Sequence, residues 1–251
     1  MSNIFYLMGK SSSGKDTLYR KLMEQNRLLK GIVSYTTRPQ RAGETDGKEY
    51  FFVTEDEMKA MEQKGIVIEK RVYHTIYGDW SYFTADDGQI QENGCDYLLI
   101  GTLESYMKVK KYYGEKRVFP VYIEVEDGIR LKRAIEREMQ QKKPNYEELC
   151  RRFLADSQDF CEENIQKCGI EQRFSNYNAD QCIKEINNYM KKNNVEYFNL
   201  VRYRNWIRQE KLSTLYDELN RVINGNNAKK CGPLISCTHF LRKNGEAKAV
   251  K

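Results

Sequence analysis

The segment Gly9-Lys10-Ser11-Ser12-Ser13-Gly14-Lys15-Asp16-Thr17 decides the fold of this chain. It follows an apolar run, residues 4–8, that is short and aromatic enough to be a buried strand, and it precedes residues 18–23, whose apolar side chains have helical spacing. A strand, a glycine-rich turn and a helix in this order are typical of a phosphate-binding loop. Gly9 and Gly14 allow backbone angles at which successive N–H groups point at an anion, and the helix start adds its positive dipole end. The segment therefore predicts nucleotide binding.

Two charged residues of this loop carry specific expectations. Lys15 supplies a mobile positive charge for the outer phosphates, and Asp16 stands where Ser or Thr normally holds magnesium. We predict that Asp16 orders magnesium through water, and that Thr17 or a second water completes the coordination shell. Two simpler alternatives are a Ser/Gly-rich turn that binds nothing, and an Asp16 that only favours the helix start through the dipole.

The composition predicts a soluble globular protein with one large domain, or one domain and an appendage. Of its 251 residues, 40% are hydrophobic and 31% are charged, and the longest apolar stretches are far shorter than the ~20 residues of a membrane helix. The N-terminus runs into the first predicted strand without a charged leader, so no signal peptide is expected. The seven cysteines form no C-x-x-C pair, which is typical of reduced thiols and predicts a cytoplasmic location.

The net charge of +6 is concentrated in the C-terminal tail. Residues 226–251 hold six Lys and Arg side chains against Glu246 alone, so they carry +5 and the first 225 residues carry only +1. The basicity is therefore no argument for a nucleic-acid-binding domain, and a flexible solubilising tail is favoured over one that contacts RNA or an acidic partner. Cys231, Cys237 and His239 match no zinc spacing, so no metal site is predicted there.

Strand and helix patterns alternate along most of the chain, which predicts a parallel sheet covered by helices on both faces. Predicted strands cover residues 4–8, 31–34, 65–69, 97–100, 118–124 and 173–174, with short antiparallel strands between 73 and 83, and predicted helices cover 54–64, 103–113, 127–141, 146–167 and 179–192. Residues 195–251 do not continue this alternation. Within them, residues 204–223 have the spacing of one amphipathic helix, for which packing on the core is favoured over dimerisation or partner binding.

A second group of residues suits a second phosphate. Arg38 and Arg41 lie in a loop with one Pro, two Gly and an Asp-Gly turn, and Tyr50 follows a short hairpin later. Arginine binds phosphate oxygens bidentately and keeps its charge, and a phenol hydroxyl can donate to the same group. The alternative is a solvated basic loop, but the tight turns that hold the arginines favour a phosphate site.

These residues resemble the guanylate kinase family. The pattern Ser34…Thr36-Thr37-Arg38…Arg41-Ala42-Gly43-Glu44…Asp46-Gly47…Tyr50, and its spacing from the phosphate loop, are similar to that family's monophosphate-binding segment. The resemblance covers roughly residues 3–193. It implies an α/β P-loop kinase fold, a three-layer α/β/α with a central parallel sheet, a small antiparallel acceptor-binding subdomain at about 34–84 and a lid at about 133–152. The guanylate kinase-like domain would span 1–193, and 195–251 would be a C-terminal helical extension with a basic tail.

The resemblance also implies an activity, the magnesium-dependent transfer of the γ-phosphate of ATP to GMP or dGMP. Its implied acceptor-binding residues are Ser34, Arg38, Arg41, Glu44, Tyr50, Glu69 and Tyr77. Glu69 would read guanine, because guanine N1–H and N2–H2 form a donor pair that a carboxylate can accept. ATP would be bound by Gly9, Ser11, Ser12, Ser13, Gly14, Lys15, Asp16 and Thr17, with Asp16 and Thr17 as the metal ligands.

The implied catalytic residues are Lys15 and three lid arginines, Arg133, Arg137 and Arg152. Their charge would stabilise the transferring phosphoryl group. Arg151 competes with Arg152 for this role, and arginines four apart that simply solvate a helix are the alternative. The expected partners are small-molecule nucleotides, and the expected assembly is a monomer or a homodimer.

Three positions depart from the family pattern. The family has Asp-x-Asp-x-Gln-Gly at the end of a strand, where residues 97–102 of this chain contain neither acid. Asp79 stands where the family has a hydroxyl that helps to read guanine O6, for which Ser81 and Thr84 are the possible substitutes. The third departure is Asp16.

Two alternative functions share the fold. Asp16 and the missing acids are also similar to ribose bisphosphate kinases, but these lack the Gly-Glu-x-Asp-Gly-x-x-Tyr-Phe-Phe stretch of residues 43–52. A non-catalytic protein-binding module would be expected to lose the lysine and glycines of the phosphate loop, and this chain has them all. Guanylate kinase activity is therefore the favoured prediction.

Overall fold

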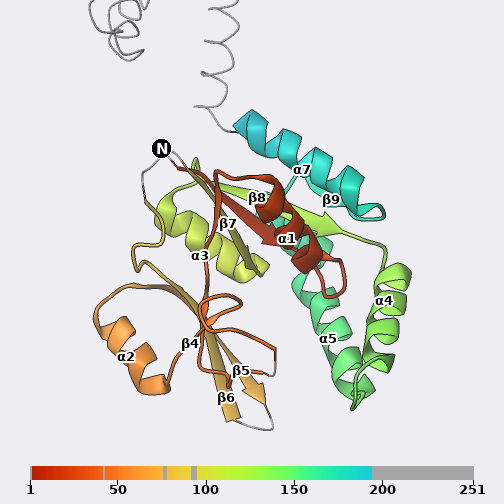
Figure 1. Ribbon diagram of the computed structural model, residues 1–251, viewed down its shortest axis with the longest axis horizontal. Coiled ribbons are helices and arrows are strands. Elements are labelled where there is room, and N and C mark those ends of the chain that lie inside the picture. Colours follow the sequence, from red (N-terminus) through yellow and green to blue (C-terminus); the bar gives the residue numbers. More distant parts are fainter. Residues whose placement is uncertain (1, 42, 76–77, 92–94, 194–251) are drawn as a thin grey trace, which may run out of the picture. The chain divides into compact units, whose positions relative to one another are not determined.

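The computed structural model describes residues 2–41, 43–75, 78–91 and 95–193 (Figure 1). The chain divides into two units, Met1–Val195 and Glu196–Lys251, and all described residues lie in the first. The predictions made for Tyr77 and for residues 195–251 fall outside the described residues. In the described part of the chain, no helix is long and apolar enough to cross a membrane.

Five parallel strands form the central sheet, in the order β2-β7-β1-β8-β9. Their bounds are Ile4–Met8 for β1, Leu29–Gly31 for β2, Asp96–Gly101 for β7, Val118–Glu124 for β8 and Arg173–Ser175 for β9. β1 lies in the middle, and all of its residues are buried. Because parallel strands end at one edge of a sheet, the loop after β1 lies between the ends of β7 and β8.

The residues of β1 alternate between the two faces of this sheet. Its even-numbered residues pack with α3 (Leu103–Tyr113) and α6 (Glu162–Lys167). Its odd-numbered residues pack on the opposite face with α1 (Lys15–Gln25) and α7 (Ala179–Asn193). The predicted three-layer α/β/α fold with a central parallel sheet is thereby confirmed (Figure 1).

A second sheet has four strands in the order β4-β3-β6-β5. The strands are Tyr35–Thr36 (β3), Phe51–Phe52 (β4), Val67–Thr75 (β5) and Gly78–Ala85 (β6). β6 is antiparallel to both β3 and β5, as predicted, but β3 and β4 pair in parallel. The parallel pair arises because the loop between β3 and β4 carries the chain back to the start of β3 before β4 begins.

α2 (Glu55–Gln63) follows β4 and begins with a capping box. Thr54 Oγ1 accepts a hydrogen bond from the Glu57 backbone N–H, and the Glu57 carboxylate accepts one from the Thr54 N–H. Two donors at the helix start are thereby satisfied.

Several predicted elements are wrong in their bounds. The strands predicted for 65–69 and between 73 and 83 are two longer strands, β5 and β6. The helix predicted for 146–167 is two helices, α5 (Tyr146–Asp159) and α6, because the chain bends at Phe160 and buries its ring against Tyr122 of β8. The strand predicted for 31–34 ends at Gly31. Beyond it, the backbone N–H and C=O of Val33 bond the side-chain amide of Gln89 instead of a neighbouring strand. α5 lies beside α4 (Asp127–Met139), and the two helices contain the predicted lid arginines (Figure 1).

Candidate active site

Close packing fixes the phosphate loop between β1 and α1. A Cβ on Gly9 would lie 2.6 Å from the carbonyl oxygen of Ile123. Gly14, the N-cap of α1, has a φ of 86°, and a Cβ there would overlap the side-chain amide of Asn176. Gly9 is therefore required by close packing, and Gly14 by both packing and its left-handed backbone angle.

Three side chains from distant elements hold the loop, and no sequence pattern singles them out. Asn176 Nδ2 donates to the carbonyl oxygen of Ser13 at 2.7 Å. Arg130 Nη1 donates to the carbonyl oxygen of Ser11 at 2.9 Å, and the Asp156 carboxylate accepts from the N–H of Ser11 at 2.6 Å. The one available signal is that Asn176 directly follows β9, at the edge of the sheet where ligands bind.

Arg130 is the buried centre of this support. Its side chain is 1% exposed, and its guanidinium lies 4.7 Å from the centre of the Phe153 ring. Nη2 also bonds the Asp127 carboxylate at 2.7 Å. This bond holds the pKa of Asp127 below its ordinary value, so its carboxyl group is ionised at neutral pH.

The loop retains groups suited to a bound nucleotide. Ser13 Oγ is buried and has no hydrogen-bond partner among the described residues. Lys15 begins α1 and is half-buried, whereas Asp16 and Thr17 are exposed. The first N–H groups of a helix have no partner within the helix, so this end of α1 suits an anion.

A cavity of about 420 Å³ opens at the carboxyl ends of β8 and β9. Lys10 of the phosphate loop, Arg130 of α4 and Tyr177 are among the residues that line it. Open α/β sheets bind ligands at this edge. The cavity is thus the candidate space for the nucleoside of the phosphate donor.

The predicted lid arginines differ in their surroundings. Arg137 Nη2 donates to Ser12 Oγ at 3.3 Å, which places a positive charge on the phosphate loop. Arg133 Nη2 donates to the backbone carbonyl of Asn176 at 3.0 Å, so it supports the residue that holds Ser13.

Arg151 and Arg152 both lie near one carboxylate of α5. Arg151 binds Glu148 through two nitrogens, at 2.7 and 2.8 Å, whereas Arg152 Nε lies 3.8 Å from it. The Arg151 bonds hold the pKa of Glu148 below its ordinary value, and the charge of Arg41 contributes in the same direction. Arg41 belongs to the predicted acceptor loop, so this part of α5 lies within electrostatic reach of it.

The predicted acceptor-phosphate residues cluster around Arg38, which is 3% exposed, whereas Glu44 and Tyr50 are half-buried and Arg41 is exposed. Its terminal nitrogens bond the Glu44 carboxylate at 3.0 and 2.8 Å, and Nε donates to the Tyr82 hydroxyl at 3.1 Å. Its guanidinium lies 5.8 Å from the ring centre of Tyr50. Glu44 also accepts from the backbone N–H of Arg41 at 2.8 Å. Glu44 therefore positions both arginines, a role that its place in the motif does not predict.

Tyr50 is the half-buried tyrosine of the acceptor side. Burial is the main cause that raises the pKa of its hydroxyl; Tyr82 and, least of all, Asp16 add to the increase, while Arg71 and Arg38 oppose it. Ser34, the other predicted member on this side, is buried, and its backbone carbonyl accepts from Phe51.

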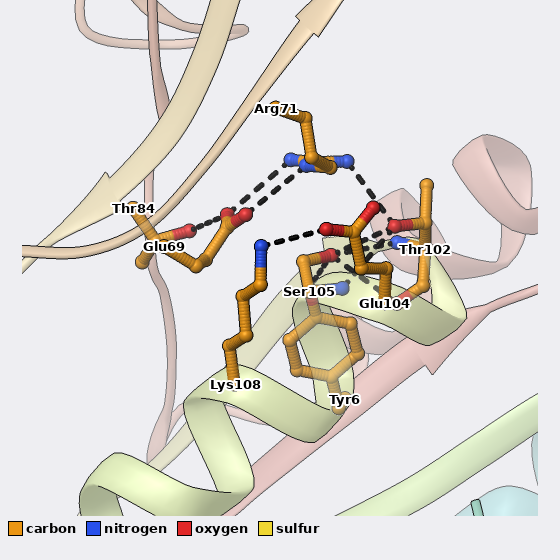
Figure 2. Close-up of polar contacts among 8 residues, drawn as sticks. All are labelled: Tyr6, Glu69, Arg71, Thr84, Thr102, Glu104, Ser105 and Lys108. Atoms are coloured by element: carbon orange, nitrogen blue, oxygen red, sulfur yellow. Dashed lines mark hydrogen bonds and ion pairs between the residues drawn. The ribbon is translucent and has the colours of Figure 1, made fainter.

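Glu69 lies in a side-chain cluster that also contains Arg71, Thr84 and Thr102, called the Glu69 cluster below. Figure 2 shows Arg71 between Glu69 and Thr102. Thr84 Oγ1 donates to Glu69 at 2.8 Å, and Arg71 donates to both carboxylate oxygens, from Nε at 3.1 Å and from Nη2 at 3.3 Å. Strand alternation places Arg71 on the same face as Glu69, a signal that the sequence contains.

The departures from the family pattern also have structural consequences. Asp79 lies at the β5–β6 turn, where it bonds His74 Nδ1 at 2.7 Å. Thr102 caps α3 by accepting from the N–H of Ser105. A Cβ on Gly101 would overlap the hydroxyl of Tyr6, so the space next to Thr102 is filled by this phenol.

The fold and the two phosphate sites together define a class of protein. A phosphate loop after the central strand of a parallel sheet, together with a second site built from arginine and tyrosine, is typical of a P-loop phosphotransferase. A family model described as guanylate kinase matches residues 1–164. The chain therefore belongs to the guanylate kinase family.

Individual relatives agree with this assignment. The chain is 36% identical over 113 residues to a guanylate kinase of Caldanaerobacter subterraneus, a match that covers 45% of this chain and 53% of the relative. It is 31% identical over 178 residues to a guanylate kinase of Syntrophomonas wolfei, which covers 69% of this chain and 80% of the relative. The match thus spans about half of the first relative and four fifths of the second.

A solved structure supports the fold. The crystal structure of guanylate kinase from Anaplasma phagocytophilum aligns with a TM-score of 0.54 and 18% sequence identity, over 77% of this chain and 87% of that chain. These comparisons do not favour the ribose bisphosphate kinase or the non-catalytic binding module.

Proposed function

We propose that this protein transfers the γ-phosphoryl group of ATP to GMP or dGMP. Membership of the guanylate kinase family supports this activity. The observation that carries it is geometric. Arg137 of the lid donates to Ser12 of the phosphate loop, which adds a cation to the donor site. On the acceptor side, Glu44 holds Arg38 and the backbone of Arg41 in one cluster suited to a second phosphate.

The proposed roles follow from charge and position. Lys15 and the N–H groups at the start of α1 bind the donor phosphates, and the support from Asn176, Arg130 and Asp156 keeps these groups in place. Arg38, Arg41, Tyr50 and Tyr77 bind the acceptor phosphate, with Glu44 as the positioning residue.

Transfer spreads charge over three phosphoryl oxygens, so catalysis is mainly positioning and cationic stabilisation with water excluded. Lys15 belongs to the loop and Arg137 contacts Ser12 within it, and Arg133 and Arg152 complete the proposed set. Glu69 and Ser34 face the guanine in this proposal. Glu69 accepts from the base, because guanine offers N–H donors where adenine offers an acceptor.

Magnesium fits the loop through oxygen donors. The described residues contain no group of three or more His, Cys, Asp or Glu placed to hold a metal, but magnesium commonly binds one or two protein oxygens and completes its shell with phosphates and water. Asp16 and Thr17 are exposed at the start of α1 and offer such oxygens. When bound, the ion neutralises charge on the phosphates. Asp16→Ala is therefore expected to lower turnover far more than ATP affinity measured by calorimetry.

The location and assembly of the protein are part of this proposal. Scattered cysteines without disulfide spacing support a cytoplasmic enzyme, and its partners are small-molecule nucleotides, bound by a monomer or a homodimer.

A coupled assay of ATP consumption tests the activity against GMP, dGMP, IMP, AMP and ribose 1,5-bisphosphate. We expect turnover with GMP and dGMP, and none with ribose 1,5-bisphosphate. Glu69→Gln should lower kcat/KM for GMP by about 100-fold, since a buried acceptor is lost. Glu55→Gln, in the exposed first turn of α2, is the matched control and should leave it unchanged. A wild-type enzyme that turns over no purine monophosphate contradicts the proposed function.

A further inference from the structure

Arg71 is paired with Glu69, the residue proposed above to read the base. It lies two residues after Glu69 on β5, and its side chain is 13% exposed while that of Glu69 is fully buried. Its Nε and Nη2 bond the two oxygens of Glu69. Its Nη1 lies 3.4 Å from Oγ1 of Thr102, the N-cap residue of α3. Arg71 therefore bridges β5 and the start of α3 (Figure 2).

The carboxylate of Glu69 has little accepting capacity left. It already accepts three hydrogen bonds, one from Thr84 and two from Arg71. A carboxylate offers about four lone-pair sites, so roughly one remains for a ligand. A guanine that presents both N1–H and N2–H2 needs two. Glu69 can therefore accept hydrogen bonds from both N1–H and N2–H2 only if Arg71 gives up its bond to one of the carboxylate oxygens.

Arg71, in contrast, has N–H donors beyond those that it uses in its hydrogen bonds to the described residues. A guanidinium carries five N–H groups, and three of those of Arg71 are used by Glu69 and Thr102. Two other groups near the base site are engaged elsewhere or have the wrong charge, and the remaining candidates, Ser34 and Ser81, are buried residues that each offer only one neutral hydroxyl donor. The Thr84 hydroxyl bonds Glu69, and Asp79 is a carboxylate at the β5–β6 turn that bonds His74. The Glu69–Arg71 pair consequently presents one acceptor site beside cationic donors.

We propose that Arg71 is a specificity-determining residue that makes the base site select 6-oxopurines without regard to the 2-amino group. This inference rests on the proposed kinase function and deepens it. Arg71 donates to O6 and Glu69 accepts from N1–H, two groups that guanine and hypoxanthine share. Adenine has the opposite pattern, a donor at position 6 and an acceptor at N1. GMP and IMP are then similar acceptors, and AMP is rejected.

The first test compares kcat/KM of the wild-type protein for GMP, IMP and AMP. We expect the GMP:IMP ratio to be tenfold or less, and AMP to be at least 100-fold poorer than GMP. A site in which Glu69 reads both donors of guanine would leave a buried acceptor unpaired with IMP, and would discriminate by about 100-fold. A GMP:IMP ratio above tenfold therefore overturns the inference, as does efficient use of AMP.

The second test removes the arginine. In Arg71→Ala, Glu69 regains the site that accepts from the 2-amino group, so kcat/KM falls for both substrates but the GMP:IMP ratio rises at least tenfold. Arg27→Ala, an exposed arginine between α1 and β2, is the matched control and should leave both constants unchanged. A thermal melt shows whether Arg71→Ala is folded. If it is not, Arg71→Lys takes its place, because lysine cannot bond both carboxylate oxygens in the same fork.

The outcomes separate the inference from the function on which it rests. Turnover of GMP with strong discrimination against IMP, or a folded variant at position 71 with an unchanged GMP:IMP ratio, overturns the role of Arg71 and leaves the kinase function intact. No turnover of any purine monophosphate overturns the kinase function itself. A purely structural role of Arg71 would lower stability and both activities together without changing their ratio.

Discussion

The phosphate loop and the Glu69 cluster are built in different ways. The loop is one continuous segment whose shape depends on Gly9 and Gly14, and its binding groups are largely backbone N–H groups. The Glu69 cluster gathers side chains from β5, β6 and the start of α3, so residues up to 31 positions apart in sequence meet in it. The first can be recognised in nine consecutive residues, whereas the second exists only after folding.

The difference matters most for charge. A backbone N–H has the same chemistry whatever surrounds it, but a buried carboxylate depends on its partner. Without a partner, the Glu69 carboxylate would accept hydrogen bonds from two donors of a base. Because Arg71 pairs with it, the two side chains together offer an acceptor from Glu69 and donors from Arg71. Base recognition therefore has to be inferred from pairs of side chains. Phosphate recognition, in contrast, can be inferred from the loop segment alone.

Lys15→Ala should have the largest effect and tests the donor side of this comparison. The variant loses the mobile charge of the phosphate loop, so kcat with GMP is expected to fall about 10³-fold, the size found when a group that stabilises developing charge is removed. Steady-state ATP consumption measures it, with Lys30→Ala on the exposed surface of β2 as the control. A fall of less than tenfold would show that the loop does not act through this lysine.

Gly14→Ala, compared with its matched control Gly88→Ala, separates the contribution of close packing to stability from the contribution of the left-handed backbone angle. The two glycines have φ angles of 86° and 87°, but a Cβ on Gly14 would overlap Asn176 while one on Gly88 meets no atom within 4 Å. Left-handed geometry costs each variant about 1 kcal/mol. Gly14→Ala should lose about 2 kcal/mol more, because the bond from Asn176 to Ser13 is also broken. Urea denaturation measures both, and equal losses would contradict the packing argument.

The sequence predicts the donor side well, because its information is local. The strand, the glycines and the helix start are contiguous, and the structure has them in that order. The three-layer fold follows from the alternation of strands and helices, and is confirmed. The side chains that hold the loop in place could not be predicted from the sequence, because Asn176, Arg130 and Asp156 come from three other parts of the chain.

The acceptor side is predicted in its residues but not in its pairings. Arg38 and Glu44 belong to one motif, yet only the structure shows that Glu44 holds Arg38. Strand alternation places Arg71 on the face of Glu69, but its contact with Thr102 depends on where the N-cap of α3 lies, which no local pattern provides. The bend at Phe160 was missed for the same reason, because a ring on β8 decides it.

Glu44→Gln tests whether the acceptor side works through positioned side chains. Gln keeps the shape but loses the charge that holds Arg38, so the affinity for the acceptor phosphate should weaken. We expect KM for GMP to rise about tenfold with kcat within about twofold, the signature of a lost binding interaction that is equal in ground and transition states. KM for ATP should not change, and a parallel rise in it would mean that the two sites are not separable.

The acid dependence of stability is the smallest predicted effect and isolates the Arg38–Glu44 pair. The hydrogen bond from Arg38 is the main cause that holds the pKa of Glu44 below its ordinary value of 4.5. Because this pKa is lowered in the folded state, the contribution of the pair is present at neutral pH and is lost as pH falls from 4.5 through the folded value.

The measurement is the difference in Tm between wild type and Glu44→Gln along this acid range. The variant has no charge to titrate at position 44, so the wild-type advantage should shrink as pH falls below 4.5 and stay constant at neutral pH. Asp127 and Glu148, whose pKa values are also lowered, are present in both proteins and cancel in the difference. A difference that does not change with pH would mean that Glu44 contributes shape alone, and the acceptor side would then resemble the phosphate loop in depending on geometry rather than on paired charge.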